Sequence, residues 1–357
     1  MWRLGAFLLL AVSLILSGCD RQPPAQRQLD DYLQRLARVL DQDWQAFDRN
    51  SLSQYRMPER RLRMHTLEQQ RMGLFTLLLQ TRHCQTLQHL ISERNSSLGR
   101  VMPSSHLLSH DAALLREIDN CLEQIADDPD RDALREQLTT LAEIKRRELP
   151  SVFWNALHGS NEFEYYLRFA DQPLPLPGSG LNIGDQSAVS ALEQLARIGA
   201  DLPDTLPPGR AQMDPLFEAL RRSERGSELI HSLALTRHSL DQATRMLNSE
   251  RATQLCPQGA LTERARILHN VFRNVYAEDV QPYLALIQRL GQPWQSALTD
   301  LQQVPGQTAA SAAYLASLQG TETALWDSYQ ESLHAHNQAW LEVLGRCGMQ
   351  PGGNGPG

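Results

Sequence analysis

Apolar residues recur at spacings of three and four along most of this chain, and this periodicity limits the possible folds more than any other feature. The segment after residue 28 is typical, with Leu29, Leu33, Leu36 and Leu40 at such intervals. This spacing places apolar side chains on one face of a helix, whereas a half-buried strand alternates apolar and polar residues. We find no convincing strand pattern and no internal repeat of fixed period. The sequence therefore predicts an all-α fold, a helical bundle of about eight to ten helices.

Proline and glycine interrupt the helical pattern near the middle of the chain. Residues 170–185 contain Pro173, Pro175 and Pro177, and a second proline-rich break follows at residues 201–210. Such clusters are typical of loops and domain boundaries. We therefore expect two helical subdomains, at residues 28–170 and 213–348, a connection with one helix at residues 171–212, and a disordered Gly/Pro tail at residues 349–357.

Two further prolines affect predicted helices. The helix that Asp130 can cap is expected to end before Pro150. Pro282 lies inside the helical pattern of residues 261–290, where its ring and its missing N–H should kink the helix.

Residues 1–18 have the organisation of a bacterial lipoprotein signal peptide. Met1-Trp2-Arg3 supplies the positive start, an apolar run too short to span a bilayer follows, and Leu16-Ser17-Gly18-Cys19 is a lipobox. Cys19 is expected to be lipidated and to become the first residue of the mature chain. Residues 19–27 are then a polar, lipid-anchored tether. The alternatives are an ordinary secretory signal and a short uncleaved anchor.

The lipobox also predicts the location of the protein. Several acyl chains hold a protein on a bilayer far more firmly than one chain does, so the first expected partner is the membrane itself, through the N-terminal lipid. The body should face the periplasm. Asp20 resembles the inner-membrane retention signal of enteric-type bacteria, which favours the inner over the outer membrane. Other bacteria use later positions for this sorting.

The charge balance argues against nucleic acid as a partner. The chain has 34 basic and 41 acidic residues, a formal net charge of −7, and loss of Arg3 with the signal peptide would make it slightly more acidic. Proteins that bind nucleic acid present basic surfaces to the phosphates. Another envelope protein is therefore the more reasonable second partner.

Four cysteines, Cys84, Cys121, Cys256 and Cys347, follow the lipobox cysteine, and in an oxidising compartment an even set predicts two disulfides. Residues equidistant from the turn of a helical hairpin lie level with each other. The midpoint of Cys84 and Cys121 falls at a predicted break near residues 102–103, so this pair should bond, which leaves Cys256 for Cys347. The alternative is four buried, reduced thiols.

Residues 92–100 form the densest polar stretch of the chain. Turn chemistry explains most of it, because Gly99 suits the end of a helix and Ser104 or Ser105 the start of the next. The functional alternative is a corner that binds a ligand or a partner. Its candidate residues are Glu93, Arg94, Asn95 and Arg100.

These motifs also resemble a known family. The lipobox, the Ser-Glu-Arg-Asn-Ser-Ser-Leu-Gly stretch at residues 92–99 and the flanking Cys84 and Cys121 are similar to an uncharacterised family of gammaproteobacterial lipoproteins, domain-of-unknown-function family 3080. The resemblance covers the mature chain. It implies no known activity, cofactor or catalytic residue.

Motifs for enzymatic chemistry are scarce. Lys145 is the only lysine and lies mid-helix, which excludes a phosphate-binding Gly-x-x-x-x-Gly-Lys loop, and neither Gly-x-Ser-x-Gly nor His-Glu-x-x-His occurs. His106 and His110, four residues apart on a helix, could chelate a metal, but no third ligand is evident. We therefore predict no catalytic residue, no metal site and no cofactor.

The functional hypothesis that follows is a cell-envelope lipoprotein with a non-enzymatic interaction or structural role at the periplasmic face of a membrane. The alternative is an envelope lipoprotein that binds a metal or a small ligand, through His106 and His110 or through residues 92–100. A hydrolase comes third, because no nucleophile and base pair is visible in the sequence.

Overall fold

The computed structural model describes residues 22–67 and 81–349, and within these ranges the protein is all-α and contains no strand. The predicted fold class is confirmed. Twelve α-helices have seven residues or more, somewhat above the expected eight to ten. They are α2 (Pro24–Leu40), α5 (Gln85–Asn95), α7 (Ser104–Gln124), α8 (Asp132–His158), α9 (Asn161–Leu167), α10 (Ser187–Ala200), α11 (Arg210–Arg222), α12 (Arg225–Leu247), α14 (Glu263–Val271), α15 (Gln281–Gln303), α16 (Ala309–Leu318) and α17 (Leu325–Arg346).

Shorter elements connect these helices. They include the one-turn helices α3 (Arg60–Arg63), α6 (Ser97–Arg100) and α13 (Glu250–Thr253), the 3-10 helix η1 (Arg49–Tyr55) and the π-helix η5 (Phe272–Val280). Some breaks between helices are very short, such as Gly159 and Ser160 between α8 and α9.

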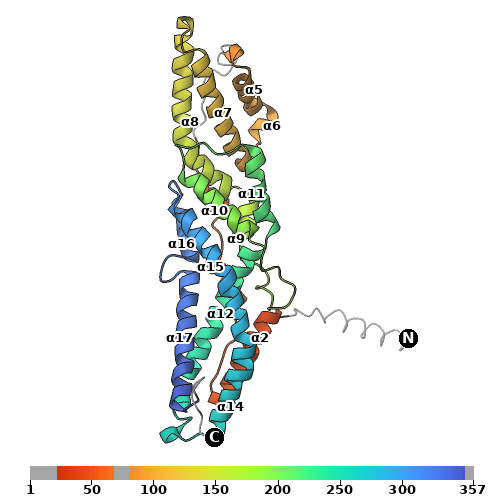
Figure 1. Ribbon diagram of the computed structural model, residues 1–357, viewed down its shortest axis with the longest axis vertical. Helices are drawn as coiled ribbons and strands as arrows, with labels where there is room; N and C mark the ends of the chain where they lie inside the picture. Colours follow the sequence, from red (N-terminus) through yellow and green to blue (C-terminus); the bar gives the residue numbers. More distant parts are fainter. Residues whose placement is uncertain (1–21, 68–80, 350–357) are drawn as a thin grey trace, which may run out of the picture.

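The helices build an elongated molecule (Figure 1). α7 and α8 form an antiparallel pair at one end, whereas α12 and α17 extend to the other end. α9, α10, α11 and α16 lie between these two parts. α2 begins in the half of the molecule that α12 and α17 form, away from either end, and runs toward the end of that half (Figure 1). The position of this first helix fixes where the chain enters the body.

α2 begins earlier than the sequence suggests. The predicted tether extends to residue 27, but α2 starts at Pro24, preceded by Pro23 as its N-cap. Proline suits the first helical position, because the N–H that it lacks would have no partner there and its φ is already helical. The segment between Cys19 and the body is therefore short.

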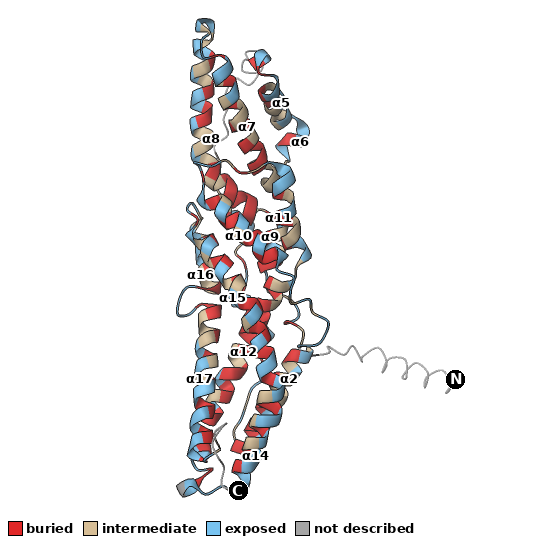
Figure 2. Ribbon diagram, viewed as in Figure 1, coloured by how far each residue is buried: buried red, intermediate tan, exposed pale blue. Residues whose placement is uncertain are grey.

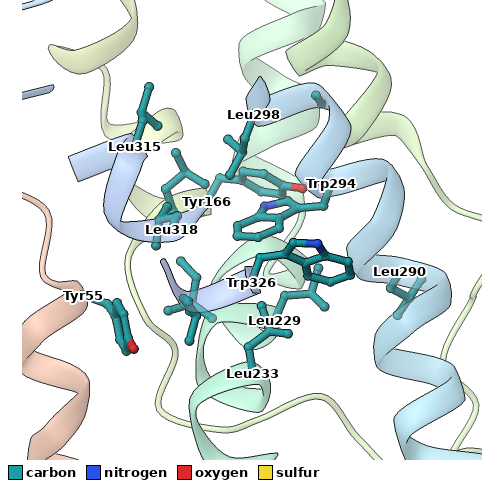
Figure 3. Packing of buried hydrophobic residues seen from close by; sticks show 14 of the residues in the cluster. Tyr55, Tyr166, Leu229, Leu233, Leu290, Trp294, Leu298, Leu315, Leu318 and Trp326 are labelled. Carbon is teal, nitrogen blue, oxygen red and sulfur yellow. The ribbon is translucent and has the colours of Figure 1, made fainter. Parts of the chain in front are cut away.

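The hydrophobic core is one continuous cluster of buried residues that extends from α2 to the end of α17. Figure 2 shows buried residues concentrated along the inner faces of the helices, with exposed ones at the α7–α8 tip. At mid-length, Trp294 of α15 lies level with Leu318 of α16, and Trp326 of α17 lies between Trp294 and the Leu229 and Leu233 side chains of α12 (Figure 3). Tyr55 of η1 and Tyr166 of α9 belong to the same cluster (Figure 3), so residues of both predicted subdomains share one core, and the division into two subdomains stays a prediction.

Both expected disulfides are present, with the expected pairing. Cys84, at the start of α5, bonds to Cys121 near the end of α7, with their Cα atoms 5.6 Å apart. Cys256 bonds to Cys347 at the end of α17, with a Cα separation of 5.3 Å. The first bond holds α5 against the α7–α8 pair, and the second ties the segment after α13 to the last helix.

The two prolines have different outcomes in the structure. α8 continues through Pro150 to His158, so the expectation that the helix ends before this proline is wrong. Pro282 is the second residue of α15 and follows Gln281, and the helical backbone continues into α15 from the nine-residue π-helix η5, so the predicted kink at this proline stays a prediction.

No helix in the described ranges is long and apolar enough to cross a membrane.

Candidate functional site

Three adjoining surface pockets form a groove along α9, in the middle of the molecule. The first has a volume of about 620 Å³ and shares Glu162 with the second, of about 320 Å³. The second shares Tyr165 and Arg168 with the third, of about 420 Å³. Because neighbouring pockets share lining residues, we treat them as one feature and call it the α9 groove. α7 and α11 border its first part, and the start of α12 borders its last part.

Local sequence signals position α9. Ser160 is its N-cap, because its hydroxyl accepts a hydrogen bond from the Phe163 amide at 3.1 Å. Glu162 and Glu164 lie in the first turn, where negative charge complements the helix dipole. Phe163 is buried, so the helix presents its charged face to the groove.

A buried arginine, Arg63, holds α9 in place from the core side of the helix. The side chain of Arg63 is only 3% exposed, and its Nη2 donates to Glu164 Oε2 at 2.7 Å. Its Nη1 donates to the backbone carbonyl of His158 at 2.8 Å. A buried charge needs such partners, and these bonds connect α3, α8 and α9 directly under the groove.

At the first end of the groove, His106 of α7 lies opposite Asp214 of α11. The distance from His106 Nε2 to Asp214 Oδ1 is 3.6 Å, too long for a direct hydrogen bond. The other oxygen of Asp214 accepts from Arg210 Nε at 3.1 Å. Glu218 accepts from Arg221 and Arg222, and these two hydrogen bonds lower the pKa of Glu218 to about 2.

The second end of the groove combines a tyrosine with two carboxylates of the α12 start. The Tyr165 hydroxyl donates to Glu224, and this hydrogen bond raises the pKa of Tyr165. The Arg168 guanidinium lies over the Tyr165 ring, 4.8 Å from its centroid. Burial, together with the nearby Glu224, raises the pKa of Glu228.

Two serine hydroxyls near the groove are engaged by the backbone, and a third serine, Ser105, lines its first pocket. Ser160 Oγ donates to the Leu157 carbonyl at 2.9 Å, and Ser227 Oγ donates to the Glu224 carbonyl at 2.6 Å. A serine nucleophile needs a neighbouring base that accepts its proton. These two hydroxyls serve as helix caps and turn bonds, so neither is arranged for nucleophilic attack.

The predicted polar corner lies on α5 and α6, and its residues have different roles. Arg94 Nη1 donates to the Gly99 carbonyl at 2.5 Å, and Asn95 Nδ2 donates to the Ile91 carbonyl at 2.7 Å. Glu93 and Arg100 are exposed. Half of the four candidate side chains thus bond to the backbone of their own corner, and two are open to solvent.

The helix boundaries at the corner differ from the expectation. Ser96, not Ser104 or Ser105, provides a side-chain cap, because its hydroxyl accepts from the Gly99 amide at 3.0 Å and starts α6. Gly99 lies within this short helix and does not end one. A Cβ atom there would lie 2.1 Å from the Glu93 carbonyl oxygen, so the close backbone approach requires glycine.

His106 and His110 do not converge on a common site. His106 is in the α9 groove, whereas His110 is buried and its Nε2 lies 3.1 Å from the Leu90 carbonyl of α5. Its neighbour Asp111 pairs with the single lysine, Lys145, at 3.0 Å. Within the described ranges, no group of three or more His, Cys, Asp or Glu side chains could hold a metal ion.

The lipidation candidate Cys19 lies outside the described residues, so the structure does not bear on it. The sequence alone does not single out the α9 groove. Phe163 and Tyr166 of α9 are buried, whereas Tyr165 lines the groove. The only local signal is the charge of its neighbours Glu162, Glu164 and Arg168.

The protein is thus an all-α molecule with a charged groove on its surface. The family model described as "Protein of unknown function (DUF3080)" matches residues 29–351, which is most of the chain, and the chain belongs to this family. No curated protein and no solved structure matches it.

Proposed function

We propose that this protein is an envelope lipoprotein, anchored by lipid on Cys19 to the periplasmic face of a membrane, with the inner membrane favoured by Asp20. Its helical body binds another envelope protein along the α9 groove and performs no catalysis. The observation on which this proposal rests is the continuous charged groove that three adjoining pockets form along α9.

Two features support the proposed location at the periplasmic face of a membrane. The Leu16-Ser17-Gly18-Cys19 lipobox follows a short apolar run, as in bacterial lipoproteins. Both remaining cysteine pairs form disulfides, which persist in oxidising compartments and are rare in a reducing cytosol. The tether between Cys19 and the first residue of α2 is short, so the body stays beside the lipid surface.

The lining of the groove indicates the chemistry of the partner. Its three pockets are lined by seven carboxylates and three arginines. Four of the carboxylates pair with arginines of the chain. Glu162, Glu224 and Glu228 have no arginine or lysine partner within 4.0 Å in the part of the chain that the structure describes. We therefore assign the groove to a segment of the partner that presents arginine or lysine side chains.

Crosslinking in cells tests this function. A photoreactive amino acid at position 165 lies in the groove, and one at position 334, exposed on α17, is the matched control. We expect a discrete crosslinked product from position 165, formed with a membrane or periplasmic protein whose crosslinked peptide contains arginine or lysine. No product from position 165, or equal products from both positions, would contradict binding along the groove.

A variant that removes negative charge from the groove tests whether charge selects the crosslinked partner. Glu162→Gln, Glu224→Gln and Glu228→Gln together should abolish the crosslink from position 165, because they remove the three carboxylates that have no arginine or lysine partner among the described residues. Glu136→Gln, Glu322→Gln and Glu331→Gln change the net charge equally at exposed positions outside the groove and should leave the crosslink intact. An undiminished crosslink in the groove variant would show that charge does not select the partner.

A further inference from the structure

The place where the chain enters the body restricts how the molecule can sit on a membrane. α2 starts at Pro24, and only residues 19–23 separate it from the lipidation site. Five extended residues span at most roughly 17 Å, at about 3.3 Å each. If Cys19 holds the lipid, as in the proposed function, the start of α2 must therefore lie within this distance of the membrane surface.

The body extends much further than the tether on both sides of this point. α2 has 17 residues and runs toward one end of the molecule for about 26 Å, at ~1.5 Å per residue. On the other side, α8 has 27 residues, is about 40 Å long, and lies wholly beyond the start of α2 (Figure 1). A molecule standing upright on either end would hold the start of α2 too far from the bilayer for the tether. The long axis must lie closer to parallel than to perpendicular.

The exposed face of α2 has the charge that suits an anionic surface. Arg27, Arg35 and Arg38 are exposed, and their spacing of eight and eleven residues from Arg27 places them on one side of the helix. Arg35 pairs with Asp31 at 2.7 Å. Within the described residues, Arg27 and Arg38 form no ion pair, so both guanidinium groups are available to an external anion.

The opposite face of α2 holds the helix firmly in the body, so this arginine stripe has a fixed direction. Leu29, Leu33 and Leu36 are fully buried, and Gln28 Nε2 donates to the Asp279 carbonyl of η5 at 2.6 Å. The stripe ends at Asp41, whose carboxylate lies 3.3 Å from Arg251.

We propose that the molecule lies on its side on the membrane, with Arg27, Arg35 and Arg38 of α2 against the phosphates of anionic phospholipids. Phosphate groups pair well with guanidinium groups, and arginines close to an anionic bilayer are attracted to it electrostatically. This proposal rests on the lipid anchor of the proposed function and adds an orientation and a headgroup class to it.

Orientation is measured with the full-length lipidated protein in vesicles of phosphatidylcholine mixed with phosphatidylglycerol. A fluorescent amino acid is placed at one of two end positions, 130 at the α7–α8 tip or 253 in α13, and the vesicles contain headgroup-linked acceptors. We expect energy transfer from both ends. Transfer from one end with none from the other would mean that the molecule stands upright, and would overturn the proposal.

The face is measured with a short-range, headgroup-linked quencher. Position 34 lies on the exposed side of α2. Position 334 is two residues from His336, which contacts Tyr32 of α2, and so points away from α2. We expect several-fold stronger quenching at position 34 than at position 334. Equal quenching at the two positions, or stronger quenching at 334, would contradict the assigned face.

A charge variant separates the arginine stripe from the tether. Arg27→Gln, Arg35→Gln and Arg38→Gln together should reduce quenching at position 34 in vesicles with phosphatidylglycerol, and have little effect in phosphatidylcholine alone. The control Arg210→Gln, Arg221→Gln and Arg222→Gln removes the same charge from exposed positions on α11. Equal effects of the two variants would overturn the role of the stripe.

The mass of the N-terminal peptide from the same preparation separates the two proposals. If Cys19 carries lipid, the anchor is established, and the fluorescence results then test only the proposed orientation. An unmodified Cys19 would overturn the anchor, and the orientation that depends on it.

Discussion

Arg94 and Arg100 lie six residues apart in the same polar corner, yet the structure gives them different roles. Arg94 donates to the Gly99 carbonyl, whereas Arg100 is exposed. We expect Arg94→Ala to lower the free energy of unfolding by about 1–2 kcal/mol, because it removes a charge-assisted hydrogen bond. Arg100→Ala should change it by less than about 0.5 kcal/mol. Chemical denaturation of both variants measures this difference, and equal losses would contradict the separate roles of the two arginines.

Buried histidines make stability depend on pH. His158 is fully buried between Trp154 and Phe163, and neither ring nitrogen has a hydrogen-bond partner among the residues that the structure describes. Burial lowers the pKa of His158 to about 3, against about 6.5 in an unfolded chain. Between these values the unfolded state binds the extra proton. The stabilisation is therefore complete above about pH 6.5 and is lost as the pH falls toward 3.

His158→Phe tests this dependence, because phenylalanine keeps the ring packing and cannot be protonated. We expect its stability at pH 7 to stay within about 1 kcal/mol of the parent, since no hydrogen bond is lost. Between pH 6 and pH 4 the parent should lose up to about 1.4 kcal/mol more per pH unit than the variant. Denaturation curves across this range provide the measurement. Parallel pH profiles for the two proteins would show that His158 is not the responsible group.

At the scale of elements, the disulfides were predictable and the helix ends were not. The pairing of Cys84 with Cys121 followed from hairpin symmetry, which needs only a turn near its midpoint. The continuation of α8 through Pro150 could not be predicted, because the packing that holds this helix together comes from distant segments: Leu149 and Val152 are fully buried in the common core. Local propensity says nothing about such tertiary support.

Loop length predicts the relative value of the two disulfides. Their cysteines are separated by 37 and 91 residues. On the chain-entropy model, the shorter loop contributes about 4 kcal/mol and the longer about 5 kcal/mol, as upper values. We therefore expect Cys256→Ser with Cys347→Ser to destabilise slightly more than Cys84→Ser with Cys121→Ser. Thermal unfolding of the two double variants measures the order of their destabilisation. A double variant as stable as the parent would contradict the expected contribution of its disulfide.

At the scale of the whole molecule, the candidate site could not be predicted because it is assembled from the fold. The α9 groove brings together His106 of α7, Asp214 of α11 and Glu228 of α12, which are far apart in sequence. Residue spacing in the sequence cannot identify side chains that only the tertiary fold brings to one groove. The all-α class, by contrast, follows from periodicity that each helix displays alone. The orientation on the membrane is also a property of the whole body, since it depends on the position of α2 along the long axis.

Lipid on Cys19 is the central claim, since the address, the short tether and the orientation all depend on it. The most direct measurement is the mass of the N-terminal tryptic peptide of protein purified from membranes. Cleavage after Arg21 would release residues 19–21. We predict a peptide that begins at Cys19 and has the mass of a diacylglyceryl thioether plus an amide-linked acyl chain, and no such species from Cys19→Ala. An unmodified Cys19, or a peptide that still contains residues 1–18, would contradict the account.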